Sequence, residues 1–280
     1  MTWRILVEHR SHFRYRGEVS SSYNEARITP LTTDSQLVLD ARVSVEPLAR
    51  PYRYLDYWGS VVHAFDVHLP HDELTVVGNS VVETTIPQTS SVGFSWGQLA
   101  DQPAADRFAE LLAPTRSVPG DPRLCEVADG LRAGRTPDEA VEAAVSWVHD
   151  TLAYVPGTTE VHTSAVEAWE GGRGVCQDFA HLTLAVVRAM GIPARYCSGY
   201  LHPNADAGVG ASISGQSHAW LETWTGGWRG FDPTIGWPIG ERHVLVARGR
   251  DYADVAPLKG IYRGETGSTL DVAVSVTRLA

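Results

Sequence analysis

The first third of the chain alternates between apolar and polar residues in short runs. These runs are Ile5–Arg10, Gln36–Val45, Val61–Leu69 and Leu74–Thr85. An alternation with a period of two is typical of a strand with one buried face, and glycine and proline residues separate the runs as turns would. We therefore predict an all-β module of the sandwich type over residues 1–90.

A helical pattern replaces this alternation further along. Residues 91–135 are interpreted as a connector and helical segment, because the stretch Pro87–Pro103 is rich in Ser, Gly and Gln. Thr136 then has the character of a helix N-cap, since Pro137 occupies the first helical position and Glu139 completes a capping box. Apolar residues recur after it at helical spacing, which predicts an amphipathic helix.

A second apolar stripe begins at a cysteine. Phe179, Leu182 and Val186 follow Cys176 on one helical face. Gly191, two residues before a proline, fits the position just beyond a helix C-terminus. We predict a buried helix that begins at or just after Cys176.

Alternating runs return beyond residue 190 and indicate strands. They are Ala194–Leu201, His218–Thr225, Trp228–Asp232, Arg242–Val246 and Leu270–Arg278. Helices followed by strands predict an α+β domain over residues 136–280. The fold class is therefore α+β, with an N-terminal β-sandwich-like domain ahead of an α+β domain.

Charge and cysteine content narrow the class of protein. The 280 residues include 23 basic and 33 acidic side chains, a net charge of −10 that repels nucleic acid and anionic membranes. The N-terminus lacks a secretory signal and no stretch approaches the ~18 apolar residues of a membrane span, so we expect a soluble cytoplasmic protein. The odd count of three cysteines argues against a disulfide framework, and we expect Cys125 and Cys197 to be small buried residues.

The third cysteine has a chemical context. At a helix N-terminus, unpaired N–H groups and the positive end of the helix dipole favour a thiolate at Cys176. Gly171, Gly172 and Gly174 remove side-chain bulk ahead of it, so a substrate backbone could approach the sulfur.

A nucleophilic cysteine needs a base and a group that orients the base, and the next strands offer both. A two-residue turn at Gly226–Gly227 would place Asp232 on the opposite face from His218. A three-residue loop, Thr225–Gly227, places Asp232 opposite Trp220 and on the face of His218. We predict the three-residue loop; a bulge elsewhere in the hairpin would restore the same parity.

Several runs now resemble a known family. GGRGVCQDFAHLTLAVVRAMGIPARYCSGY at residues 171–200, SHAWLETW at 217–224 and WRGFDPTIG at 228–236 resemble the three motifs of the transglutaminase-like superfamily, whose core is related to papain-type cysteine proteases. DYWGS at Asp56–Ser60 is similar to the signature of the β-rich N-terminal region of bacterial members. The resemblance covers nearly the whole chain.

The resemblance implies a transglutaminase/papain-like catalytic domain with a Cys-His-Asp triad. In it Cys176 is the nucleophile, His218 is the base and then the acid, and Asp232 holds the imidazole. A thiolate of this kind attacks a carboxamide or peptide carbonyl and forms a thioester, which water or an amine then resolves. The implied partner is a protein or peptide substrate, with no cofactor and no metal. The choice between hydrolysis and amine transfer, calcium dependence and the oligomeric state stay open.

Other residues are candidates for substrate binding. The Cys176 N–H is a candidate oxyanion donor, and Gln177 and the Tyr154 hydroxyl are candidates for further contacts. Asp178 has three interpretations: a carboxylate favoured by the helix dipole, a brace for a nearby loop, or a substrate contact. Trp220 either shields the imidazole from water or belongs to the core.

Two alternatives belong to other functional classes. Cys176, His218 and Asp232 are all metal-ligand types, although three ligands are too few for a closed zinc site. The chain could also be a non-catalytic peptide-binding module on the same scaffold, but its triad residues are intact. The long loop of small residues at 201–217 has the profile of a lid or a substrate-binding loop.

Overall fold

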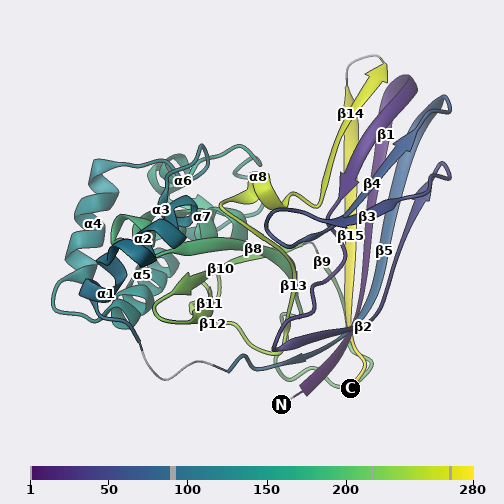
Figure 1. Ribbon diagram of the computed structural model, residues 1–280. Helices are drawn as coiled ribbons and strands as arrows, with labels where there is room; N and C mark the ends of the chain where they lie inside the picture. Colours follow the sequence, from purple (N-terminus) through teal and green to yellow (C-terminus); the bar gives the residue numbers. More distant parts are fainter. Residues whose placement is uncertain (1, 89–92, 216, 265–266) are drawn as a thin grey trace.

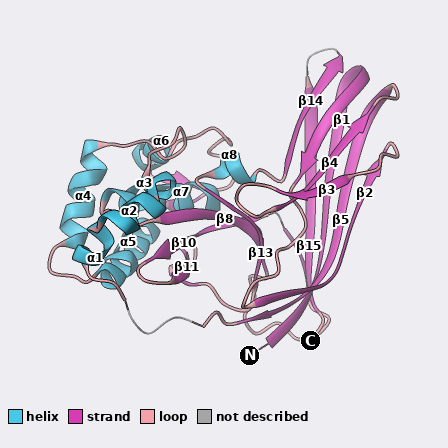
Figure 2. Ribbon diagram, in the orientation of Figure 1, coloured by secondary structure: helices cyan, strands magenta, loops and turns pink. Residues whose placement is uncertain are grey.

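The computed structural model describes residues 2–88, 93–215, 217–264 and 267–280. The chain forms a large β-sheet and, beside it, a part in which helices surround a smaller sheet (Figures 1 and 2). Of the expected connector Pro87–Pro103, residues 89–92 lie outside the described residues.

The large sheet is organised by one long first strand, β1 (Thr2–Ala26). Its first half pairs with β5 and β15, and its second half pairs with β4 and β14. The order along the sheet is β2-β5-β1-β15-β9, with β3, β4 and β14 off this path. The other strands are β2 (Gln36–Glu46), β3 (Tyr52–Leu55), β4 (Val61–Val67), β5 (His71–Thr85), β9 (Ser212–Gly215), β14 (Leu258–Gly264) and β15 (Ser268–Arg278).

The predicted β-rich N-terminal part is present, and its strands form one connected sheet that folds over its own apolar cluster. A register shift in β1 between Arg14 and Val19 marks the place where its partner strands change. The cluster takes side chains from β2, β4 and β5 of this sheet and from the end of β1. The buried members are Ala26, Ile28, Val45, Phe65, Val67, Leu74 and Val76.

The C-terminal strands complete this N-terminal sheet. β15 pairs with β1 from Ile5 opposite Arg278 to Tyr15 opposite Ser268. β9 lies within the segment 201–217, which has the sequence profile of a lid or a substrate-binding loop, and it pairs with β15. Two strands from beyond residue 136, where the α+β domain was predicted to begin, therefore belong to the N-terminal sheet. Local alternation identifies a strand but not its distant partner.

The second part is built around α7 (Cys176–Ala189). All its residues from Gln177 to Arg188 are buried, so the predicted single apolar stripe understates its central position. Gly191 follows with a φ of 84°, as expected beyond a helix C-terminus. The helix packs on an antiparallel sheet of order β12-β11-β10-β8-β13. These strands are β8 (Ala194–Leu201), β10 (His218–Trp224), β11 (Trp228–Asp232), β12 (Trp237–Pro238) and β13 (His243–Gly249).

Further helices cover α7 on the side away from the large sheet (Figure 1). The capping box predicted at Thr136 is present, because its side chain accepts from the N–H of Glu139 and its own N–H donates to the Glu139 carboxylate. Among the described residues, no helix is both long and apolar enough to cross a bilayer. The remaining elements are α1 (Trp96–Ala100), α2 (Gln102–Arg107), α3 (Ala109–Leu112), α4 (Pro122–Arg132), α5 (Pro137–Thr151), α6 (Ala165–Gly171), α8 (Tyr252–Val255), β6 (Ala153–Tyr154) and β7 (Arg173–Gly174).

A buried glutamine ties the two parts together. Gln36 Oε1 accepts from the N–H of Leu245 at 2.8 Å, and its Nε2 donates to the carbonyls of Leu245 and Leu31 at 2.8 and 2.5 Å. The cluster beside it includes Leu31, Trp220 and Leu245, which come from both parts. Because the side-chain amide of Gln36 is satisfied across the boundary, it fixes the first strands against the sheet that carries the candidate site.

Candidate active site

The start of α7 is held by an aspartate three residues after its N-cap. The Asp178 carboxylate accepts from the N–H of Val175 at 2.7 Å and from Thr159 Oγ1 at 2.6 Å. This is the bracing role among the three interpretations. Asp178 is only 1% exposed, and its carboxylate is buried against its own loop.

Two of the preceding glycines have structural reasons of their own. A Cβ at Gly174 would lie 2.6 Å from the Asp178 side chain, so only glycine leaves room for the brace. Gly172 ends α6 with a left-handed φ of 63°. Together they let the chain turn sharply and place Cys176 at the first position of α7.

The hairpin that carries the base and the carboxylate has the predicted register. Leu221 lies opposite Phe231 and Trp224 opposite Trp228, which leaves a three-residue loop at 225–227. This register extends to place Asp232 on the face of His218, because side chains alternate along each strand.

His218 and Asp232 meet at the end of this hairpin. His218 Nε2 lies 2.6 Å from Asp232 Oδ2. The other carboxylate oxygen, Oδ1, accepts from the N–H of Thr234 at 3.0 Å, and Asp232 is fully buried. Since Nε2 is occupied by the carboxylate, Nδ1 is the imidazole nitrogen that is left for the thiol.

The electrostatics of this pair favour an ionised state. Burial disfavours the imidazolium, but the hydrogen bond and charge of Asp232, and then a hydrogen bond with Cys176, raise the pKa of His218 to about 10. Burial would raise the pKa of Asp232, yet His218 and a second histidine, His243, hold it below its ordinary value. The structure thus places Asp232 against one ring nitrogen of His218 and Cys176 close enough to act on the charge of the same imidazole.

His243 is the residue of this site that the sequence analysis missed. Its Nε2 lies 3.2 Å from Asp232 Oδ2, the oxygen that also contacts His218. Its only signal in the sequence is a histidine at the head of an apolar run that follows the WRGFDPTIG segment. That signal is weak, because β13 pairs with β8 and reaches Asp232 only through the tertiary fold.

The other candidate residues have different surroundings. Trp220 is fully buried and packs against both imidazoles, with its ring 6.2 Å from that of His218 and 5.3 Å from that of His243. Gln177 is largely buried and donates to the carbonyl of Val161 at 3.2 Å. Tyr154 alone of the candidates is open, with 52% of its surface exposed.

Tyr154 lies beside the thiol on a short strand. β6 pairs with β7 in parallel, with Tyr154 opposite Gly174. Burial raises the pKa of the Tyr154 hydroxyl, and the nearby charges of Cys176 and Asp232 act in the same direction. The phenol therefore stays protonated at neutral pH and is able to donate a hydrogen bond near the sulfur.

The remaining cysteines differ from each other. Cys197 is buried, as expected, and burial raises the pKa of its thiol well above the ordinary value. Cys125 is exposed, which corrects the expectation that it is buried. Cys125 lies on α4, on a face of this helix that points away from the core.

The possible metal ligands also differ from the set considered from sequence. Among the residues that the structure describes, His218, Asp232 and His243 form a group whose ligand atoms lie within 4.8 Å of one another. The group therefore contains His243 in place of Cys176, which was the third possible ligand considered from the sequence.

Comparisons with known proteins agree with this geometry. Residues 126–233 match the family described as the transglutaminase-like superfamily, and residues 5–83 match the bacterial transglutaminase-like N-terminal region. The chain belongs to the transglutaminase-like superfamily. Its α+β fold, with a β-rich N-terminal part, is the fold of this family.

Relatives of this transglutaminase-like chain extend over its full length. An uncharacterized protein of Mycobacterium leprae is 50% identical over 99% of this chain and 100% of its own. An uncharacterized protein of Mycobacterium tuberculosis is 33% identical over 98% of this chain and 93% of its own. A protein-glutamine gamma-glutamyltransferase of Pseudomonas aeruginosa is 30% identical over 61% of this chain but only 27% of its own length.

A solved structure shares the fold. The crystal structure of a proposed cysteine protease from Cytophaga hutchinsonii superposes with a TM-score of 0.74 at 23% identity, over 99% of this chain and 98% of its own. The agreement over both chains means that the two parts are arranged alike in the two proteins.

Proposed function

We propose that this chain is a cysteine-dependent enzyme that cleaves carboxamide or peptide bonds through a thioester. The observation that carries the proposal is the buried contact of 2.6 Å between His218 Nε2 and Asp232 Oδ2, which leaves Nδ1 for the thiol of Cys176. A base that is oriented by a carboxylate and placed beside a thiol is the arrangement that activates a cysteine nucleophile.

The first half of the reaction follows from these groups. Cys176 Sγ, as a thiolate, forms a bond to the substrate carbonyl carbon, and the carbonyl electrons move to the oxygen. When the tetrahedral intermediate collapses, the C–N bond breaks and His218 Nδ1–H gives its proton to the departing amine. The products are a free amine and a thioester on Cys176.

The second half reverses the roles. His218 Nδ1, now neutral, takes a proton from water or from an incoming amine as its oxygen or nitrogen attacks the thioester carbon. The C–S bond breaks, and the thiolate and imidazolium are restored. Asp232 stays ionised throughout and holds the imidazole in one tautomer.

The oxyanion needs donors, and two are near the sulfur. The N–H of Cys176 belongs to the first turn of α7 and has no intrahelical acceptor. The Tyr154 hydroxyl stays protonated at neutral pH, and its side chain is exposed to solvent. We propose these two groups as the donors that stabilise the oxyanion, and the removal of one such donor typically lowers kcat by about 10²–10³-fold.

The chain contains its own reference thiols for the test. We expect iodoacetamide at pH 7 to alkylate Cys176 much faster than the exposed Cys125, with the buried Cys197 the slowest, as measured by peptide mapping over time. In a His218→Ala variant the advantage of Cys176 over Cys125 disappears. If Cys176 in the wild type reacts no faster than Cys125, the thiol is not activated and the proposal is wrong.

A second assay separates the outcomes of the thioester. A casein-type protein is incubated with the enzyme and a labelled primary amine, and both label incorporation and peptide release are measured. Fragments without label indicate hydrolysis of peptide bonds, and label without fragments indicates amine transfer. Cys176→Ala is the control that removes both, and binding of casein without either product would support the non-catalytic peptide-binding alternative.

A further inference from the structure

One oxygen of the buried carboxylate serves two imidazoles. Asp232 Oδ2 lies 2.6 Å from His218 Nε2 and 3.2 Å from His243 Nε2. We infer that His243 is a positioning residue of the catalytic centre, which holds this oxygen in place for His218. The inference rests on the proposed function and adds a fourth member to the proposed triad.

Elements from both sides of β10 bring these groups together. Asp232 ends β11, which pairs with β10, and His243 begins β13, which lies on the far side of β8. The two residues meet next to the first residue of β10, His218. Trp220 packs edge-on against His243 with 5.3 Å between ring centres, so the second imidazole has little freedom to rotate.

The backbone decides which nitrogen of His243 carries the proton. The N–H of Gly240 donates to His243 Nδ1 at 3.2 Å. A nitrogen that accepts a hydrogen bond is unprotonated, so the proton of the neutral ring is on Nε2 and points at Asp232. His243 therefore supplies the carboxylate with an N–H donor.

His243 also stays neutral. Burial lowers the pKa of its imidazole, the contact with Asp232 opposes this, and the charges of His218 and Arg242 add to the lowering. A second imidazolium would compete with His218 for the single negative charge of Asp232. A neutral donor fixes the oxygen and leaves that charge to His218.

The same tautomer argues against a metal at this cluster. The three ligand atoms are close enough together to surround an ion. A metal-bound histidine usually donates its second ring N–H to an acceptor. Here the group that faces Nδ1 of His243 is the Gly240 N–H, which is a donor. If Nε2 bound a metal, the ring proton would be on Nδ1, and two N–H donors, Nδ1–H and the Gly240 N–H, would face each other.

The consequence for catalysis is geometric. The Thr234 N–H holds Oδ1 and His243 holds Oδ2, so the carboxylate keeps its orientation while His218 gains and loses its proton. Without His243, a buried oxygen loses a donor and the carboxylate gains freedom to turn. A displacement of about 1 Å at a catalytic group lowers rates by up to about 10²-fold.

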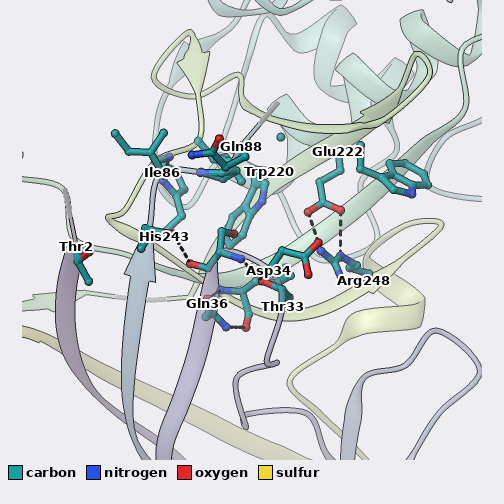
Figure 3. Close-up of a pocket in the computed structure, with 18 residues that line it drawn as sticks. Thr2, Thr33, Asp34, Gln36, Ile86, Gln88, Trp220, Glu222, His243 and Arg248 are labelled. Atoms are coloured by element: carbon teal, nitrogen blue, oxygen red, sulfur yellow. Dashed lines mark hydrogen bonds and ion pairs between the residues drawn. The ribbon is translucent and has the colours of Figure 1, made fainter. Parts of the chain in front are cut away.

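A space beside His243 allows a chemical test. His243 and Trp220 lie in the wall of a cavity of about 780 Å³ between the two parts of the chain (Figure 3). Figure 3 shows that Gln36, Glu222 and Arg248 line the same cavity. In a His243→Ala variant this cavity gives free imidazole a route to the vacated position.

The experiment compares His243→Ala with His9→Ala, which removes another buried imidazole, at a hydrogen bond to Tyr200 outside the site. We expect His243→Ala to lower kcat by about 10–100-fold with KM little changed, and imidazole to restore part of it. His9→Ala leaves kcat within about twofold. An unchanged kcat in His243→Ala overturns the inference while wild-type turnover still supports the proposed function.

A second readout does not depend on turnover or on variant folding. Nitrogen-15 NMR of the histidine side chains in the wild type should show His243 as the neutral tautomer with its proton on Nε2 from pH 7 to 9. A proton on Nδ1 of His243 or a His243 imidazolium would overturn the inference. A shift of the His218 and His243 signals together on addition of one equivalent of Zn²⁺ would also overturn it. If the tautomer is as expected but the wild type cleaves nothing, the proposed function fails separately.

Discussion

At the scale of single residues, the site depends on a buried carboxylate that remains charged. Burial alone would raise the pKa of Asp232, and the two imidazoles reverse that effect. The same contact raises the pKa of His218 to about 10, so imidazolium and carboxylate form an ion pair over the neutral range. The charges offset each other locally, which is the condition under which buried ions are tolerated.

Replacement of the carboxylate by an amide tests this pair. In Asp232→Asn we expect the pKa of His218 to fall, because the charge that holds its proton is gone, and kcat/KM to fall by about 10²–10⁴-fold. Nitrogen-15 NMR titration of His218 and steady-state kinetics measure the two effects. An unchanged His218 titration would mean that Asp232 does not set the charge of the imidazole.

The raised pKa also predicts how stability depends on pH. His218 is near 6.5 in the unfolded chain and about 10 in the folded one, so its contribution is complete below pH 6.5 and is lost as the pH rises through 10. The free energy of unfolding of the wild type, relative to His218→Gln, should therefore decrease between these values in urea titrations. A difference that increases with pH would contradict the assigned direction.

At the scale of elements, the start of α7 depends on one missing side chain. Gly174 leaves room for the Asp178 carboxylate, which caps the Val175 N–H and holds Cys176 at the helix start. The register of the β10–β11 hairpin was predictable because side chains alternate between two faces of a strand, so Asp232 has only two possible positions relative to His218: the same face or the opposite one. The contact of His243 with Asp232 was not, because the pairing of β13 with β8 leaves no local pattern.

The glycines ahead of Cys176 provide a matched pair of variants. Gly174→Ala places a methyl group against Asp178, and we expect a loss of about 1–3 kcal/mol in the free energy of unfolding and slower alkylation of Cys176. Gly171→Ala has nothing within 4 Å of the new Cβ and should change neither. Equal behaviour of the two variants in denaturant titration and alkylation would show that the Asp178 brace is unimportant.

At the scale of the whole molecule, the N-terminal sheet and the part that carries the candidate site are not sequential units. The last strand, β15, lies between β1 and β9 in the large sheet, so the chain returns to its beginning after it has built the site. The sequence predicts an α+β fold with a β-rich first part, but it does not reveal this return. Strand pairing over more than 250 residues depends on shape and burial, which local patterns do not encode.

Gln36 is the test of the boundary between the parts. Gln36→Ala leaves the buried N–H and carbonyl of Leu245 without side-chain partners, and we expect a loss of about 1–3 kcal/mol in the free energy of unfolding. Gln102→Ala is the control, because its hydrogen bond to Asp106 is exposed. Thermal and urea unfolding measure the stability of both variants. Equal free energies of unfolding for Gln36→Ala and Gln102→Ala would show that the boundary does not depend on Gln36.

The most direct test of the whole account is to trap the acyl-enzyme. The wild type is mixed with 4-nitrophenyl acetate, quenched in acid after one turnover, and mapped by mass spectrometry. The account predicts one acetyl group on Cys176, none on the exposed Cys125 at the same time, and none on Cys176 in His218→Ala. An acetyl group that is absent from Cys176, or equally abundant on Cys125, would contradict it.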